Sequence, residues 1–239
     1  MSLTIARLRE WYDSMIRRDY ILRMIQDFFE VLSRIKALKQ GQLWREAAGT
    51  VDEEFQRLLG SGAQSLARLS ETELLAKLIQ GEPTQVVREK TLMLCTLLKE
   101  AGDIATAQGR LEEGRSSYVK GLNLLLDTLA RDEVFDCPEF VPRVQVFVDA
   151  LADSPVPLST QARLMQHYET IQEFAKAEDA LFAMLEAEPA NPDLVNLGTA
   201  FYQRLRSQTD TNLLAGNLPR AELESGLAEL RQRQTPRAS

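Results

Sequence analysis

LMQHYETIQEFAKAEDALFAMLEAEPANPDLVNLGTAF, residues 164–201, is the stretch of this sequence that indicates the fold most clearly. Its apolar residues recur three and four positions apart, which is the spacing of one face of an α-helix. Asn191 is a typical N-cap, and the proline that follows it suits the first turn of a helix. The stretch and its flanks therefore predict helices at about residues 159–172, 174–187 and 192–207.

The rest of the chain carries similar signals. The alternating pattern of a half-buried strand is not sustained anywhere, and 12 glycines and 9 prolines are few for 239 residues. Capping boxes open at Ser70 and at Asp136, and Asp19 is a plausible N-cap for the first long helix. Pro142 would lie inside the helix that follows Asp136, which leaves a later start for that helix as the alternative. Further helices are expected at about residues 19–41, 43–60, 70–81, 83–108, 109–129, 136–152 and 218–232.

Small and large residues follow a definite order between residues 164 and 189. Ala177 stands early in the second helix, Leu181 follows it, and Glu188-Pro189 closes the stretch. This order resembles the tetratricopeptide repeat, in which small residues lie where two helices cross closely and a proline ends the unit. Residues 196–201 resemble the first helix of a further repeat. The resemblance implies an all-α fold of antiparallel helical hairpins stacked as a tetratricopeptide-like right-handed superhelix, an α-solenoid; the alternative is a non-repeat helical domain.

Glycines stand at small positions in the two helices expected between residues 83 and 129. They are Gly102 in the first helix and Gly114 and Gly121 in the second. A glycine costs about 1 kcal/mol relative to alanine in a helix interior. Their presence therefore suggests that the two helix backbones approach each other unusually closely. About a dozen extra residues precede the repeat-like turn at Gly216, which interrupts the last repeat.

The N-terminal half also resembles an uncharacterised bacterial family of tetratricopeptide-like proteins. The resemblance rests on RRDYILRMIQDFFEVLSRI from Arg17, on the hairpin at Trp44 and Ala47, and on GRLEEGRSSYVKGLNLLLDTL. It covers about residues 17–130 and implies a helical fold and a bacterial source, but no activity. We expect an N-terminal helical hairpin region at 1–81, tetratricopeptide-like repeats at 82–232 and a disordered tail at 233–239.

Composition narrows the classes of partner. The chain has 28 Lys and Arg against 35 Asp and Glu, a net charge of −7, so it repels phosphate backbones and nucleic acid is not expected to bind. No apolar run reaches the length of about 20 residues that spans a bilayer, and the N-terminus lacks the features of a signal peptide. We therefore expect a cytoplasmic protein without a membrane partner.

Residues suited to catalysis are scarce. His167 is the one histidine, and no His, Cys or carboxylate stands around it at metal-ligand spacing. Cys95 lies in an apolar run, and neither it nor Cys137 belongs to a redox or nucleophile motif. No glycine-rich loop follows a strand, as a nucleotide site would require. We expect no metal, no cofactor and no enzymatic activity.

A binding surface is the remaining functional expectation. In a tetratricopeptide array the first helix of each hairpin lines a concave groove that accepts a peptide. The resemblance implies a non-catalytic interaction module or adaptor that holds a protein or peptide partner there. Tyr202 is expected to be its aromatic anchor. A structural homo-oligomer, such as a dimer formed through the N-terminal helix, is the alternative, and an enzyme is the second alternative. The expected peptide-binding residues are Arg163, Gln166, Asn196, Thr199, Tyr202 and Gln203.

Overall fold

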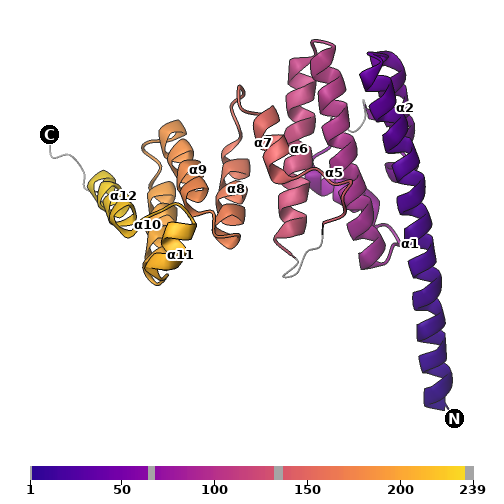
Figure 1. Cartoon of the computed structure of the whole chain (residues 1–239), viewed down its shortest axis with the longest axis horizontal. Coiled ribbons are helices and arrows are strands. Elements are labelled where there is room, and N and C mark those ends of the chain that lie inside the picture. The colour runs from indigo at the N-terminus through magenta and orange to yellow at the C-terminus, as the bar shows by residue number, and fades with distance from the viewer. Residues whose placement is uncertain (1, 64–67, 132–136, 235–239) are drawn as a thin grey trace. The chain divides into compact units, whose positions relative to one another are not determined.

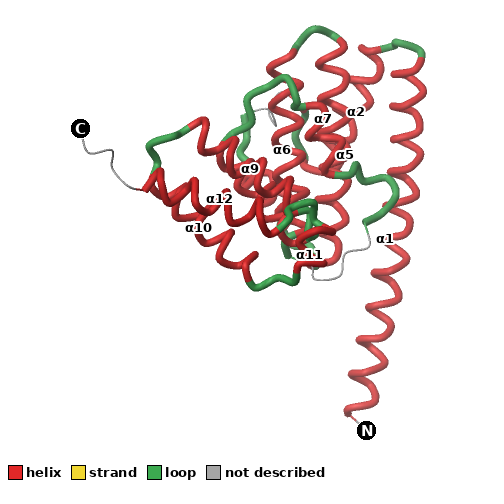
Figure 2. The backbone as a smooth tube through the Cα atoms, turned by 60° about the vertical axis from the view of Figure 1, so that its left-hand side comes forward, coloured by secondary structure: helices red, strands yellow, loops and turns green. Residues whose placement is uncertain are grey.

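The computed structural model describes the backbone of residues 2–63, 68–131 and 137–234, and the side chains of residues 18–63, 68–131 and 137–233. Helices are the regular secondary structure throughout these ranges (Figure 2), so the all-α prediction is confirmed. The helices are α1 (Ser2–Gln40), α2 (Trp44–Leu59), α4 (Glu71–Ile79), α5 (Thr84–Ala107), α6 (Leu111–Leu129), α7 (Val144–Ala150), α8 (Leu158–Thr170), α9 (Phe174–Ala187), α10 (Pro192–Arg206), α11 (Asp210–Ala215) and α12 (Arg220–Gln234).

The first compact unit, Met1–Ser154, is built around α5. Its most extensive helix pair is α5 with α6 (Figure 1), and α1, α2 and α4 also pack against α5. Every residue from Thr91 to Leu98 is consequently buried. This burial explains why the sequence there, TLMLCTLL, is apolar on all sides of the helix.

The second compact unit, Pro155–Ser239, contains α8 to α12. α8 and α9 form a tight hairpin, and α10 packs mainly against α12. Ala177 is completely buried. A Cβ atom added to Gly198 would lie 2.9 Å from Leu181 of α9 and 2.6 Å from Leu230 of α12. Small residues therefore occupy close helix contacts in this unit.

Glycines also let α5 and α6 approach closely in the first unit. A Cβ atom at Gly102 would overlap the ring of Tyr118, which is buried on α6. A Cβ atom at Gly114 would overlap the Thr106 hydroxyl and lie 3.1 Å from the Gly102 carbonyl oxygen. The close backbone contact expected from these glycines is confirmed.

Local capping signals located several helix ends correctly. Ser70 accepts a hydrogen bond from the Glu73 amide, and the Glu73 carboxylate accepts one from the Ser70 amide, so this capping box is present. Gly60 ends α2 with φ of 65°, and Asn191 caps α10 through the Asp193 amide. These ends were predictable because each depends on residues within one turn of the chain.

The start expected for the first helix at Asp19 is wrong. α1 is continuous from Ser2 to Gln40, so Asp19 lies inside it. Residues 2–40 contain no glycine or proline that would end a helix, and Asp19 alone is not a sufficient stop signal. The side chains of residues 2–17 lie outside the described part of the structure.

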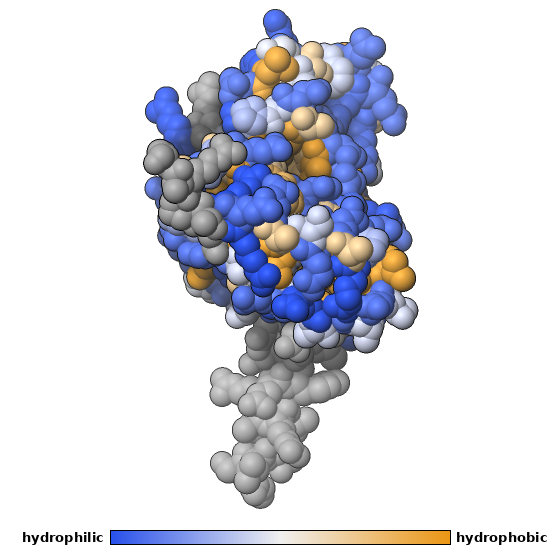
Figure 3. All heavy atoms as spheres, turned by 90° about the vertical axis from the view of Figure 1, so that its left-hand side faces the viewer, coloured by the Kyte–Doolittle hydropathy of each residue, from blue (hydrophilic) through white to orange (hydrophobic). Residues whose placement is uncertain are grey.

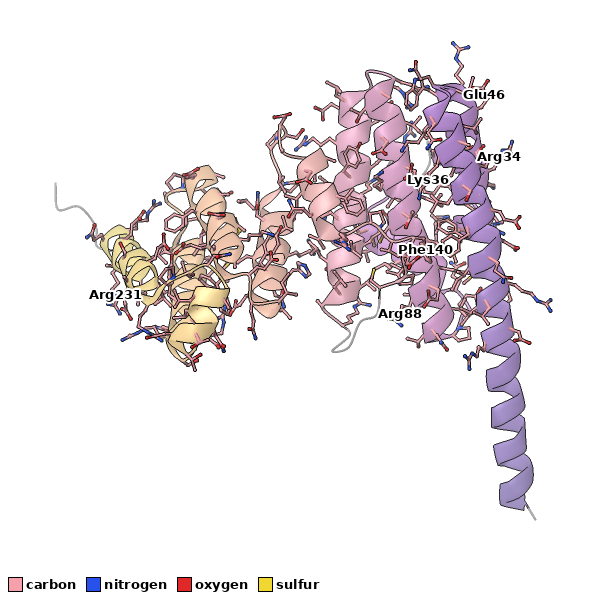
Figure 4. All side chains as sticks on the ribbon, viewed as in Figure 1. Arg34, Lys36, Glu46, Arg88, Phe140 and Arg231 are labelled. Carbon is pink, nitrogen blue, oxygen red and sulfur yellow. The ribbon has the colours of Figure 1, made fainter. Side chains whose placement is uncertain are left out.

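The helix expected at about residues 136–152, for which Pro142 left a later start open, begins at Val144. Asp136 lies outside the described residues, and the segment after it packs without forming a helix. Phe140 makes edge contacts with Phe28 and Phe29 of α1, with ring centroids 5.2 and 5.5 Å apart (Figure 4). Its carbonyl oxygen accepts a hydrogen bond from the Thr96 hydroxyl at 3.3 Å. These contacts, and Pro142 before the helix, explain the late start.

The C-terminal elements differ from the prediction in two places. The extra residues before Gly216 contain the short helix α11, capped by Thr209. α12 ends at Gln234, so the first two residues of the expected tail are helical, and residues 235–239 lie outside the described part. The domain boundary expected after residue 81 falls inside the first unit, because α2 and α4 both pack on α5. No helix in the described ranges has the length and apolar character needed to cross a membrane.

Candidate binding grooves

A groove of about 770 Å³ lies between α8 and α10 in the second unit. α8 lines it with Arg163, Gln166, Glu169 and Thr170. Gln166 stands three residues after Arg163, and Glu169 and Thr170 stand three and four residues after Gln166, so all four share one face of the helix. We call it the α8–α10 groove. Two of the predicted binding residues, Arg163 and Gln166, lie at this groove.

The opposite side of the α8–α10 groove comes from a different face of α10 than the sequence suggested. Leu197, Arg204, Leu205 and Gln208 line it. The residues expected at the groove, Asn196 and Gln203, each stand one position before a residue that lines it, Leu197 and Arg204. The register expected for α10 is therefore rotated by about one residue relative to the register in the structure.

The other four predicted binding residues do not line this groove. Asn196 and Gln203 are exposed elsewhere on α10. The Thr199 hydroxyl donates a hydrogen bond to the Val195 carbonyl oxygen at 2.8 Å, within its own helix. Sequence reasoning thus located the α8 side of the groove but not the α10 side.

Tyr202, predicted to be an exposed aromatic anchor, is completely buried, and this part of the prediction is wrong. Its hydroxyl donates a hydrogen bond to the Glu178 carboxylate of α9 and lies where Gly226 of α12 leaves room for it. Burial, together with this carboxylate, raises the pKa of Tyr202. The cause of the error is the packing of α12 on α10. The helical spacing of three leucines in α12, which are buried in the structure, could have indicated this packing: Leu223, Leu227 and Leu230.

An ion pair joins the two sides of the α8–α10 groove. Arg204 donates through Nε to Glu169 Oε1 at 2.6 Å and through Nη2 to Oε2 at 2.7 Å. The hydrogen bonds to Glu169 raise the pKa of the Arg204 guanidinium. Because Arg204 is largely exposed, the pair adds little stability. Its two parallel bonds instead fix the separation of α8 and α10 at this point.

The base of the groove is apolar and its edges are polar. Met165, Phe174 and Leu205 contribute buried side chains beneath it. Side chains that can donate or accept hydrogen bonds surround them: Gln166, Thr170, Gln172 and Gln208. On the face drawn in Figure 3, hydrophobic side chains form small separate patches among polar ones. A groove of this kind can bury a few apolar side chains while amides fix the orientation of a backbone.

His167 lies on α8 but does not line the α8–α10 groove. Its ring lies 5.7 Å from the Tyr168 ring, and burial lowers its pKa. In the ranges whose side chains are described, no group of three His, Cys, Asp or Glu residues could hold a metal ion. Cys95 is a buried free thiol whose pKa is raised by burial.

A second groove, in the first unit, was not predicted from sequence. It has a volume of about 610 Å³ and is lined by α2, α5 and α6. We call it the α2–α5–α6 groove. α2 lies far in the chain from the consecutive helices α5 and α6, so no local pattern in the sequence could have indicated this groove.

The comparisons with known proteins give one match. No curated protein and no solved structure matches the chain. The sequence model described as a family of unknown function, DUF6483, matches residues 15–235. This match includes helices of both units and extends well beyond the resemblance noted for residues 17–130. The chain therefore belongs to the family of unknown function DUF6483.

Proposed function

We propose that this protein is a non-catalytic binding module that holds a peptide segment of another protein in the α8–α10 groove. In this proposal its helical hairpins act as tetratricopeptide-like units in the bacterial cytoplasm. The small residues at close helix contacts, Ala177 and Gly198, support the tetratricopeptide-like interpretation. The observation that carries the functional proposal is the groove itself.

The dimensions and chemistry of the groove favour a peptide as its ligand. Its residues on α8 extend from Arg163 to Thr170, about two helical turns, or roughly 10 Å. That length matches three residues of an extended chain. The buried base at Met165 and Leu205 can take apolar side chains, while Gln166 and Gln208 can bond a peptide backbone.

Filling the groove is expected to abolish partner binding without unfolding the protein. Gln166 is an exposed residue of the groove, so Gln166→Trp would occupy it with little cost in stability. We expect recovery of the partner to fall by about tenfold or more, the usual consequence of losing a central contact. Quantitative mass spectrometry after affinity capture from an extract of the source cells measures this loss.

The matched control is Gln203→Trp, because Gln203 is an exposed glutamine of α10 that does not line the groove. It should recover the partner as the wild type does, and both variants should keep the wild-type melting temperature. Equal recovery by all three proteins would contradict the proposal. Loss with Gln203→Trp alone would move the binding surface to the face of α10 that the sequence first suggested.

A further inference from the structure

We propose that the N-terminal half of α1 pairs with the same segment of a second copy of this chain, as an antiparallel coiled coil that forms a homodimer. The proposal concerns the first unit and does not depend on peptide binding, because the α8–α10 groove belongs to the second unit. Three features carry it: α1 is longer than its packing partners require, its packed face becomes polar beyond them, and an apolar stripe continues on another face.

α1 extends well beyond the helices that it packs on. Its 39 residues are about 58 Å long, and its main partners are α2 and α5. Arg57, near the end of α2, lies 3.7 Å from Asp27, and Ile21 is the first buried residue among the α1 side chains that are described. Residues 2–20 therefore continue for roughly 28 Å past the packed part, as Figures 1 and 2 show.

The packed face of α1 becomes polar where the helix leaves the unit. This face consists of buried residues spaced three, four or seven positions apart: Ile21, Met24, Phe28 and Ile35. The same spacing continued toward the N-terminus reaches Arg17, Ser14 and Glu10. These residue types cannot extend the core, which explains why no part of the unit covers this half of the helix.

An apolar stripe continues on another face of the same helix. Leu22 and Phe29, which stand seven residues apart, are 50% and 42% exposed. Phe29 contacts the Phe140 ring of its own chain, so the part of this face left for a partner begins at Leu22. Residues spaced three, four or seven positions apart continue it toward the N-terminus, and we call them the α1 stripe: Ile5, Leu8, Tyr12, Met15 and Leu22.

A second copy of the stripe supplies the area that a stable interface needs. A helix of this length is only marginally stable in water without packing. Tyr12 and its neighbour Trp11 each bury about 150–250 Å² when covered, so the four aromatic side chains of two copies contribute about 600–1,000 Å². The aliphatic residues of the stripe raise this area to the roughly 1,200 Å² of a specific interface.

Asp19 favours the antiparallel orientation. It occupies an inward position of the heptad pattern, between Met15 and Leu22. A parallel pair would place the two Asp19 carboxylates opposite each other, and like charges repel. An antiparallel pair centred between residues 13 and 14 overlaps the whole stripe. Asp19 then lies opposite Leu8 of the second copy, whose neighbour Arg9 can pair with it.

The mass of the full chain in solution tests the homodimer. Light scattering after size-exclusion chromatography at micromolar concentrations should give about 54 kDa, twice the 27.0 kDa of one chain. Met15→Glu places a charge in the stripe and should weaken dimerisation by about tenfold or more. Ser14→Glu, the adjacent residue on the polar face, is the matched control and should dimerise as the wild type does.

Three results would overturn the homodimer. The first is a wild-type chain that stays monomeric at these concentrations, and the second is equal dimerisation by Met15→Glu and Ser14→Glu. The third is a monomeric chain that sediments with vesicles of phosphatidylcholine and phosphatidylglycerol, which would assign the stripe to a lipid surface.

Disulfide crosslinking tests the orientation. Leu8→Cys and Asp19→Cys are made separately in a Cys137→Ser background, which removes the exposed native thiol. After oxidation with copper phenanthroline, an equimolar mixture of the two variants should give a crosslinked dimer, while each variant alone should stay mainly uncrosslinked. Crosslinking of each variant alone, with none gained on mixing, would show a parallel pair and contradict the proposal.

Discussion

Gly102→Ala is expected to destabilise the protein by about 1–3 kcal/mol, although alanine is the better helix former. The added Cβ atom would overlap three atoms of the Tyr118 ring. That ring has little freedom to move, because it is buried and its hydroxyl donates a hydrogen bond to Asp103 Oδ1 at 3.0 Å. α5 and α6 would have to separate, and they form the most extensive helix pair of the chain.

Gly49→Ala is the matched control and should have the opposite sign. Gly49 also lies inside a helix, α2, but no atom outside its own helix turn lies within 4 Å of an added Cβ atom. Removing a glycine there should stabilise the protein by up to about 1 kcal/mol. Free energies of unfolding from urea titrations measure both changes. A stabilising effect at Gly102, or equal effects at both sites, would show that α5 and α6 are not packed this closely.

Lys39→Met is expected to destabilise the protein by about 2–3 kcal/mol. Lys39 of α1 donates hydrogen bonds to Asp103 and, at 2.5 Å, to Glu100 of α5. The Glu100 side chain is only 4% exposed, so loss of Lys39 leaves a buried carboxylate with less compensation. Lys99 limits the loss of stability, because its Nζ lies 2.7 Å from Asp103 Oδ2 and still pairs with this carboxylate when Lys39 is replaced. Lys36→Met, at an exposed position one turn earlier, should change stability by no more than about 0.5 kcal/mol.

The effect of Lys39→Met should depend on pH. Burial raises the pKa of Asp103, but hydrogen bonds from Lys39 and Lys99 outweigh burial and leave this pKa below its ordinary value. A carboxyl group whose pKa is lower in the folded state than in the unfolded state stabilises the protein at pH values above the unfolded-state pKa, which is about 4. That stabilisation is lost as the pH falls through the folded-state pKa.

Because Lys39 contributes to this stabilisation, wild type and Lys39→Met should converge in stability as the pH is lowered below about 4. Urea titrations at several pH values test this expectation. A difference between the two proteins that stays constant from neutral pH to pH 3 would mean that the ion pair with Asp103 does not stabilise the folded state.

The helices were predictable from sequence wherever their signals were local. The Ser70 capping box, the glycine end of α2 and the Asn191 cap of α10 each involve neighbours in the chain, and the structure contains all three. α11 was missed because its six residues, Asp210–Ala215, are too few to show a helical period.

The α8–α10 groove could be predicted only in part, because its two sides depend on different contacts. The register of α8 follows from its own hairpin with α9, and Gln166 was assigned to the groove. The register of α10 depends on α12, which follows it after an insertion that contains α11. Tyr202 is consequently turned toward Gly226, a contact that requires the tertiary structure to identify.

Photo-crosslinking detects a peptide bound in the α8–α10 groove at the residue that contacts it. A photoreactive benzoyl-phenylalanine replaces Thr170, an exposed residue at the edge of the groove, or Gln203, an exposed residue outside it. We expect position 170 to crosslink to one defined segment of a partner protein in an extract of the source cells, and position 203 not to crosslink. Crosslinks from position 203 alone, equal crosslinking from both positions, or none from position 170 would contradict it.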